Sequence, residues 1–229
     1  MSSTNLSVII PALNERESLE VLIPQIQAVT RELGIEAEIL VVNGPSRDGT
    51  AEAATALGAR VVPQKERGYG GALMAGFGAA LSDYVLTMDA DLSHPPTFIG
   101  DLWNHRDEAE LIIASRYVAG GGATMGWSRV VMSRLLNVTF RLLLRLPVRD
   151  LSSGYRLYRR SCLGPLRLQS RDFDVLEEIL VLGYRREWRV KEMPFYYMPR
   201  QMGASHAKLI RFGWAYLKTL ARMLRLRTS

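Results

Sequence analysis

Tyr84-Val-Leu-Thr-Met-Asp89-Ala-Asp91 is a short apolar run that ends in two carboxylates separated by one residue. The length of this run predicts a buried strand. Carboxylates that follow a strand of an open α/β sheet lie at the edge where such sheets bind ligands. Two carboxylates held together there suit Mg²⁺ or Mn²⁺ that bridges to a phosphate-bearing substrate. Taken alone, the pair is equally compatible with an acidic turn.

The sequence on both sides of this stretch alternates between strand and helix patterns. Strands are predicted at 6–10, 38–42, 60–62, 84–88 and 111–114, and helices at 14–33, 50–57 and in the later part of 68–78. Asn14, with Glu17 three residues on, offers a side-chain cap for the first helix, and Gly34 ends it. This alternation predicts an α/β fold with a mostly parallel central sheet flanked by helices.

The charges divide unevenly along the 229 residues. Residues 1–114 contain 7 Lys and Arg against 16 Asp and Glu, whereas residues 115–229 contain 22 against 7. The net charge of +6 therefore conceals a first half of −9 and a second half of +15. A basic half indicates an anionic partner, either nucleic acid or a membrane surface, with a merely basic soluble surface as the alternative.

Two helical patterns in the second half help to separate these partners. From 127 to 146 apolar residues occupy most of the helix circumference and three arginines share a narrow stripe, which predicts a helix that is buried or lies in lipid. From 208 to 226 a basic face lies opposite a bulky apolar face, as in helices of a membrane interface, and packing on the protein itself is the alternative. Because the arginines are interleaved with aliphatic side chains, nucleic acid is disfavoured.

Neither a secretory leader nor a membrane span is evident in the sequence. The first residues are polar, and no apolar run approaches the roughly 18 to 20 residues that cross a bilayer. We therefore expect that the protein does not cross a membrane by itself. The single Cys162 excludes an internal disulfide and is interpreted as a small packing residue.

Three further polar or glycine-rich clusters follow predicted strands. Pro11-Ala-Leu-Asn14-Glu15 follows the first, Asn43-Gly-Pro-Ser-Arg-Asp48-Gly-Thr the second, and Gly68-Tyr-Gly-Gly71 comes shortly after the third. Since the carboxyl ends of parallel strands meet at one edge of a sheet, the clusters would line the same rim as Asp89 and Asp91. This convergence weakens the interpretation of the two aspartates as a simple turn.

Five ordered segments resemble the signatures of inverting family 2 glycosyltransferases, and among these the dolichol- or polyprenol-phosphate mannose synthases. The segments are 8–17, 38–50, 89–96, 114–118 and 149–158, and the resemblance extends over about residues 6 to 208. It implies a glycosyltransferase A-type, nucleotide-binding fold. The catalytic domain would comprise residues 1–207, and residues 208–229 would form a basic amphipathic helix on a membrane surface.

The resemblance also implies a nucleotide-sugar donor, usually GDP-mannose in this group. By position, Asp89 would contact the donor and, with Asp91, hold Mg²⁺ or Mn²⁺, which neutralises charge on the departing diphosphate. The residues placed at the nucleotide are Pro11, Asn14, Glu15, Asn43, Asp48 and Gly71. The sequence departs from the family pattern at two places. Asn43 and Gly44 stand where the family commonly has paired aspartates, one of which helps to hold the nucleoside, and this leaves the identity of the base open. Ser93 replaces a glutamine, which leaves the metal preference open.

Arginines form the acceptor side that the resemblance implies. Arg116 and the pair Arg129 and Ser133 match family residues that meet a lipid phosphate, and 129 and 133 are neighbours on a helix. A prenyl phosphate offers such arginines an anion beside a hydrocarbon tail, and structural ion pairs are the alternative.

Three later residues resemble a loop that closes over the donor phosphates, and they are Arg200, Ser205 and Lys208. The histidines His94 and His105 are interpreted as structural.

These residues predict metal-dependent, inverting transfer of a sugar, foremost mannose from GDP-mannose, to a polyprenyl or dolichyl phosphate at the cytoplasmic face of a membrane. A phosphate monoester is already anionic near neutral pH, so the reaction needs no general base. A UDP-sugar donor or a saccharide acceptor is the first alternative, and a saccharide would need a base from among Asp150, Glu177 and Glu178. A non-catalytic membrane-binding module is the second. We expect a peripheral enzyme without a nucleic-acid partner, and a separate membrane subunit is left open.

Overall fold

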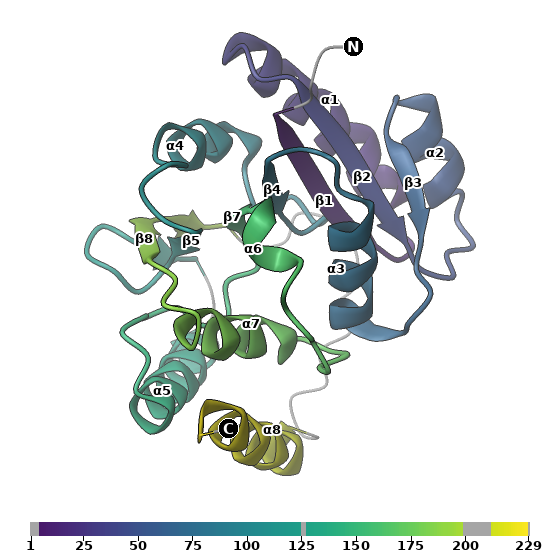
Figure 1. The fold of residues 1–229 in the computed structure, drawn as a ribbon. Helices are drawn as coiled ribbons and strands as arrows, with labels where there is room; N and C mark the ends of the chain where they lie inside the picture. The colour runs from purple at the N-terminus through teal and green to yellow at the C-terminus, as the bar shows by residue number, and fades with distance from the viewer. Residues whose placement is uncertain (1–4, 125–126, 199–211, 229) are drawn as a thin grey trace.

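The computed structural model, which describes residues 5–124, 127–198 and 212–228, is built on a seven-stranded sheet (Figure 1). The strand order is β3-β2-β1-β4-β7-β5-β8, and all neighbours are parallel except β7, which is antiparallel to β4 and β5. The strands are β1 (Leu6–Ala12), β2 (Ala37–Asn43), β3 (Arg60–Pro63), β4 (Tyr84–Thr87), β5 (Leu111–Ser115), β7 (Arg156–Arg159) and β8 (Val190–Pro194). Two short strands, β6 (Gly122–Ala123) and β9 (Tyr196–Tyr197), pair separately. The mostly parallel α/β sheet expected from the sequence is confirmed.

Helices cover both faces of the sheet because alternate strand residues enter two separate hydrophobic cores. Val8 and Ile10 of β1 enter one core and Ile9 enters the other. The first core is covered by α1 (Arg16–Glu32), α2 (Thr50–Ala56), a 3₁₀ turn at Pro96–Phe98 and α4 (Ile99–Asn104). The second is covered by α3 (Gly68–Ala79), α5 (Trp127–Leu144), α6 (Arg160–Leu163), α7 (Val175–Tyr184) and α8 (Phe212–Thr228) (Figure 1). Burial on both faces explains why β1 is almost entirely apolar.

The topology brings the ends of several strands to one rim. In the register of β1 and β2, Ala12 lies beside Asn43 at the carboxyl ends of both strands. Because β7 is antiparallel to its neighbours, the loop that precedes it returns to the rim where β4 and β5 end. Thr87 at the end of β4 donates its hydroxyl to the carbonyl of Gly154 in this loop, at 2.7 Å.

The first helix starts differently from the sequence prediction. Asn14 does not cap α1, since its backbone is left-handed with φ of 55° and its side-chain oxygen accepts the N–H of Arg47 at 2.9 Å. Glu15 takes the N-cap position without a side-chain capping bond. The expected cap is wrong because the loop after β2 uses the Asn14 side chain. Gly34, with φ of 65°, follows the end of the helix as expected.

The C-terminal helix α8 packs on the rest of the protein. Its described apolar residues Leu220, Met223 and Leu226 join the core that α7 lines, and Met223 is fully buried. Arg222 also bonds to Asp174, next to the start of α7. This packing corresponds to the alternative that the sequence left open for this helix, and its contact with a membrane stays a prediction.

Helix α5 has two apolar faces. Phe140 and Leu144 are buried in the core. The exposed residues of the opposite side are Trp127, Val131, Met132, Leu135, Val138, Leu142 and Leu143. Across the described residues, no helix combines the length and the hydropathy needed to cross a bilayer.

Candidate active site

Asp89 and Asp91 lie just past the end of β4, at the rim predicted from the sequence. Leu92 takes a left-handed conformation, with φ of 63°, that turns the chain back. Asp91 is buried, and its Oδ1 accepts the backbone N–H of Ser93 at 3.1 Å and also the Ser93 hydroxyl. Ser93, which departs from the family pattern, therefore orients the aspartate.

Asp89 and Asp91 fit a divalent cation that arrives with a substrate. Among the described residues, no group of three or more His, Cys, Asp or Glu side chains is arranged to hold an ion unaided. Mg²⁺ is typically bound by one or two carboxylates, with substrate phosphates and water completing its shell. The carboxylate pair matches this kind of site better than an all-protein metal cage.

A chain of hydrogen bonds joins the loop after β1 to the loop after β2. The backbone N–H of Asn14 donates to the Ser46 hydroxyl at 3.0 Å, and this hydroxyl donates to Asn43 Oδ1 at 2.7 Å. The two predicted nucleotide residues Asn14 and Asn43 are thus brought together through Ser46. Asn43 uses its amide oxygen as an acceptor inside this network.

Asp48 and Thr50 accept backbone N–H groups at the start of α1. The N–H of Glu15 donates to Thr50 Oγ1 at 3.0 Å, and that of Arg16 donates to Asp48 Oδ2 at 3.1 Å. Burial acts to raise the pKa of Asp48, but hydrogen bonds from the Thr50 hydroxyl and from the backbone N–H groups of Arg16 and Thr50 lower it overall. Glu15, Arg16 and Asp48 line a polar hollow of about 580 Å³. Pro11 lies half-buried within β1.

The glycine-rich segment starts α3 at Gly68, so it is helical from its first residue and not only in its later part. A Cβ on Gly71 would lie 2.1 Å from the carbonyl oxygen of Glu66. The N–H of Gly71 donates to the carbonyl of Arg171 at 3.3 Å. Close packing of the chain therefore explains Gly71, and its contact with a nucleotide stays a prediction.

Arg116, after β5, is held by Asp150 in the loop before β7. Nε donates to Oδ2 and Nη2 to Oδ1 of Asp150, both at 2.7 Å, and Asp150 is fully buried. Burial opposes both charges, but the ion pair lowers the pKa of Asp150 and raises that of Arg116. Glu192 of β8 fixes the loop, because its carboxylate accepts the N–H groups of Arg149 and Asp150 at 2.8 and 2.9 Å. The lipid-phosphate role of Arg116 stays a prediction beside this structural pairing.

Ser133 of α5 bonds to the segment that follows Arg116. The Tyr117 hydroxyl donates to Ser133 Oγ at 2.6 Å, and the Tyr117 ring lies 5.1 Å from the guanidinium carbon of Arg116. Asn137, one turn further on, accepts the N–H of Leu151 at 2.8 Å. The structure thus brings Ser133 and Arg116 together at one end of the rim.

The other predicted residues are placed only in part. Arg129 lies one turn before Ser133 on α5, and its side chain is outside the described part of the structure. Arg200, Ser205 and Lys208 lie outside the described residues.

Residues 7–166 match the family model described as glycosyl transferase family 2. The chain belongs to this family. It is 35% identical over 213 residues to a dolichol-phosphate mannosyltransferase of Pyrococcus furiosus, a match that covers 88% of this chain and 59% of that protein. It is 33% identical over 214 residues to a polyprenol monophosphomannose synthase of Mycolicibacterium smegmatis, covering 86% and 79%. The chain thus spans 59% of the length of the first relative.

Solved structures confirm the glycosyltransferase A-type fold. A glucosyl-3-phosphoglycerate synthase from Mycobacterium tuberculosis in complex with UDP has a TM-score of 0.75 at 22% identity, covering 98% of this chain and 80% of that one. The same enzyme with Mn²⁺, UDP and glucosyl-3-phosphoglycerate has a TM-score of 0.73 at 23% identity, with the same coverage. At this level of identity the likeness concerns the fold alone.

Two residues that organise the Arg116 and Asp150 end of the rim in this family 2 glycosyltransferase were missed from the sequence. Asn137 left a signal, because it is a polar residue on the side of its helix that carries the core residue Phe140. Glu192 could not be recognised from the sequence, because it bonds to Asp150, 42 positions earlier in the chain.

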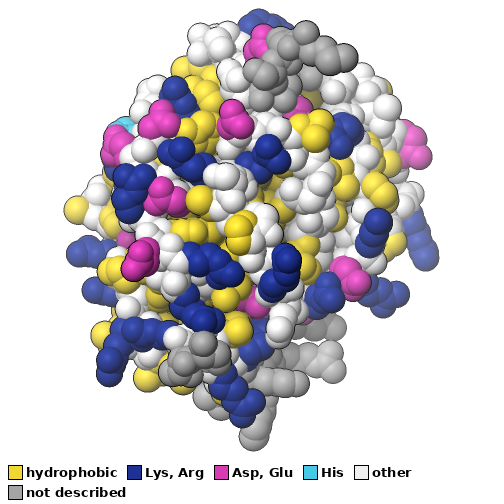
Figure 2. All heavy atoms as spheres, in the orientation of Figure 1, with side chains coloured by type: hydrophobic (Ala, Val, Ile, Leu, Met, Phe, Trp, Pro, Cys, Tyr) yellow, Lys and Arg dark blue, Asp and Glu magenta, His cyan; other side chains and the backbone are white. Residues whose placement is uncertain are grey.

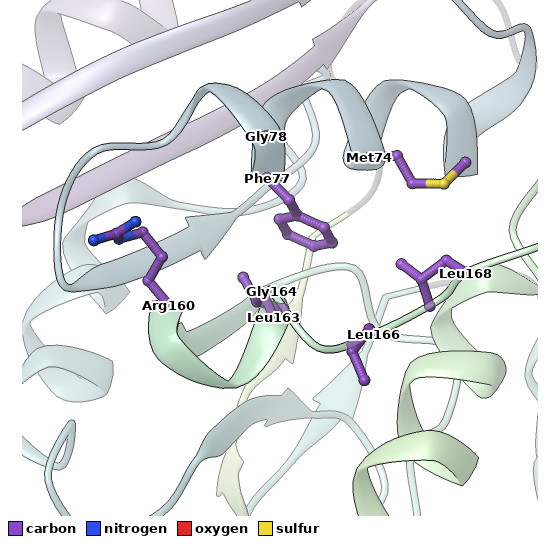
Figure 3. Close-up of a pocket in the computed structure, with 8 residues that line it drawn as sticks. All are labelled: Met74, Phe77, Gly78, Arg160, Leu163, Gly164, Leu166 and Leu168. Carbon is purple, nitrogen blue, oxygen red and sulfur yellow. The ribbon is translucent and has the colours of Figure 1, made fainter.

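A second hollow of the glycosyltransferase lies between α3 and α6, away from the rim (Figure 3). It measures about 260 Å³, and its lining residues are Met74, Phe77, Gly78, Arg160, Leu163, Gly164, Leu166 and Leu168. Because α6 directly follows β7, it lies at the opposite edge of the sheet from Asp89. No carboxylate lines this hollow, so it does not resemble a metal or donor site.

Proposed function

We propose that this family 2 glycosyltransferase transfers a hexose, with inversion, from a nucleotide sugar to a polyprenyl phosphate. Mannose from GDP-mannose is the donor that we infer. The names of the two relatives, a dolichol-phosphate mannosyltransferase and a polyprenol monophosphomannose synthase, support this choice.

The carboxylates at the acceptor end carry the argument for a phosphate acceptor. Asp150 and Glu178 are both fully buried, the first bonded to Arg116 and the second to backbone N–H groups. Glu177 has a buried Oε2 with no hydrogen-bond partner among the described residues. A saccharide hydroxyl would need an accessible base, whereas a phosphate monoester is already a nucleophilic anion. Asp150 and Glu178 are therefore committed to structural bonds and poorly placed to act as a base, which favours the phosphate.

The protein's own residues would act by binding and orientation. Mg²⁺ or Mn²⁺, held by Asp91 with Asp89, would supply positive charge to the departing nucleoside diphosphate. Ser133 and the Arg116 loop would orient the lipid phosphate in line with the anomeric carbon. A phosphate oxygen then bonds to that carbon as its bond to the diphosphate oxygen breaks, which inverts the configuration.

The exposed face of α5 is our proposed membrane contact. Trp127 is 80% and Leu142 66% exposed, and both lie on a stripe with Leu135 at helical spacing. A helix that is apolar on nearly all sides is typical of a core or of lipid. Figure 2 shows dark-blue basic side chains interspersed with yellow apolar ones over the lower part of the molecule, where α5, α7 and α8 lie. Such a mixture suits an anionic lipid surface.

The reaction is tested with purified protein, Mg²⁺ or Mn²⁺ and a polyprenyl phosphate, challenged with a panel of GDP- and UDP-sugars. We expect mannosyl lipid phosphate from GDP-mannose, and no product when unphosphorylated polyprenol replaces the acceptor. Transfer from none of the donors would overturn the enzymatic proposal.

Asp91→Ala should abolish metal-dependent turnover, and full turnover would exclude the metal role. Arg129→Ala should raise the acceptor KM and spare nucleotide binding, whereas equal loss of both would exclude an acceptor role.

The membrane contact is tested by flotation with anionic vesicles. Replacing both Trp127 and Leu142 with serine should weaken vesicle binding about tenfold or more, given the transfer free energy of two large apolar side chains. Leu81→Ser is the matched control, because Leu81 is 70% exposed and lies between α3 and β4. Equal vesicle binding by the control and the double variant would refute the assignment of α5.

A further inference from the structure

The backbone N–H of Asp89 lies just past the last ladder bond of β4. The preceding N–H, of Met88, still donates to the carbonyl of Ile9 in β1 at 3.1 Å. The N–H of Asp89 instead donates to Nδ1 of His94, at 3.0 Å. An imidazole thus replaces a strand partner at the point where the chain leaves the sheet.

The ring of His94 is held in place by aromatic side chains. It stacks on Tyr155 with centroids 4.8 Å apart and an angle of 18° between the planes, and it meets Phe195 and Tyr197 edge-on at 5.9 and 6.2 Å. Tyr155 ends the loop that precedes β7, and Tyr197 belongs to β9. The histidine therefore links the Asp89 turn to segments from the second half of the chain.

The contacts of His94 define its tautomer. Because Nδ1 accepts the backbone N–H of Asp89, this ring nitrogen carries no proton. A neutral imidazole that accepts at Nδ1 carries its proton on Nε2. This Nε2 lies 3.9 Å from Oδ2 of Asp89.

We propose that His94 is a positioning residue for Asp89, fixing its backbone through Nδ1 and biasing its carboxylate through Nε2–H. Ser93 does the corresponding work for Asp91. The consequence for catalysis rests on the proposed function, in which Asp89 meets the donor and the cation. A histidine that only packed against its neighbours would not need its two ring nitrogens.

Two substitutions separate positioning from packing. His94→Phe keeps the aromatic stack and removes both nitrogens, which leaves the buried N–H of Asp89 without an acceptor. His94→Asn loses the stack but can place Oδ1 where Nδ1 was. Positioning predicts that His94→Phe lowers kcat by about tenfold to a hundredfold, with little change in acceptor KM, and that His94→Asn recovers much of kcat despite a lower Tm. A larger kcat loss in the Asn variant than in the Phe variant would overturn the proposal.

Two readouts do not depend on transfer. Calorimetry with GDP and Mn²⁺ should show weaker binding to His94→Phe than to His94→Asn, and the reverse order would contradict positioning. Nitrogen NMR of the ligand-free protein, which has three histidines, should show one neutral ring with its proton on Nε2 that is absent from His94→Asn. A proton on Nδ1 of the His94 ring would overturn the positioning proposal, whether or not the protein transfers sugar. If the proton is on Nε2 but no sugar is transferred, the result counts against the proposed function alone.

Discussion

Glu177→Gln should remove a pH dependence from the stability of the protein. Burial raises the pKa of Glu177, in the first turn of α7, from 4.5 to about 7, and Asp174 and Asp150 act in the same direction while Arg156 opposes them. Between pH 4.5 and about pH 7, Glu177 of the folded protein holds a proton that it has released in the unfolded chain. The free energy of unfolding therefore falls as pH rises from about 4.5 to 7 and then levels off.

The size of the effect follows from the shift. At 1.36 kcal/mol per pKa unit, a rise from 4.5 to about 7 costs about 3 kcal/mol of stability above pH 7. Glutamine has a similar shape and is neutral at every pH. The Gln variant should therefore match the wild type near pH 5 and exceed it by about 2 to 3 kcal/mol at pH 8.

Urea denaturation at pH 5, 6, 7 and 8 measures this difference. Glu52→Gln on α2 is the control, because Glu52 is exposed and its loss changes the net charge by the same amount. If the free energy of unfolding differs between Glu177→Gln and the wild type by the same amount at pH 5 and at pH 8, the reasoning is refuted. A loss of stability at pH 8 would also refute it, because it would mean that Glu177 is charged and paired with Arg156.

Two further substitutions probe the rim. Gly154→Ala should abolish turnover, because the added Cβ would lie 2.6 Å from the Tyr69 hydroxyl and 3.4 Å from Asp89 Oδ1. Steady-state kinetics measure the loss of turnover, and a melting curve of the variant shows how much of that loss comes from unfolding. Glu192→Gln should cost about 1 to 3 kcal/mol of unfolding free energy and raise the acceptor KM more than the donor KM, since one amide of the Asp150 loop would lose its acceptor. Unchanged urea midpoints and KM values would exclude this role.

Most of the sheet was predictable because its order follows from local patterns. Runs such as Leu6–Ile10 are apolar on both faces, and glycines at positions 34 and 58 end the helices that follow β1 and β2. The antiparallel β7 was not predicted. It begins with Arg156, a charged residue that is nonetheless fully buried, and it inserts between two strands that come much earlier in the chain. Neither property can be inferred from a local pattern.

The site was predictable where it depends on strand ends and not where it depends on contacts between distant loops. Asp89 and Asp91 lie at the rim because they directly follow β4. Asn14 was expected to cap its own helix, but it bonds to the loop after β2, 33 positions away. His94 was interpreted as structural, and its bond to Asp89 was not foreseen because it depends on a turn whose shape the sequence does not specify.

The +15 charge of the second half overstates the surface that it offers to an anion. Arg156 is buried and donates to three backbone carbonyls, and Arg116, Arg189 and Arg222 each pair with a carboxylate. None of the ion pairs among the described residues involves Arg134, Arg141 or Arg145, three arginines on or next to α5. These three lie beside the exposed apolar face of the same helix. Electrostatic attraction by the arginines and burial of the apolar side chains would both favour binding to an anionic lipid surface. If α5 is the membrane contact that we propose, the attracting charge lies on this helix, whereas the paired arginines hold the fold and the loop that precedes β7.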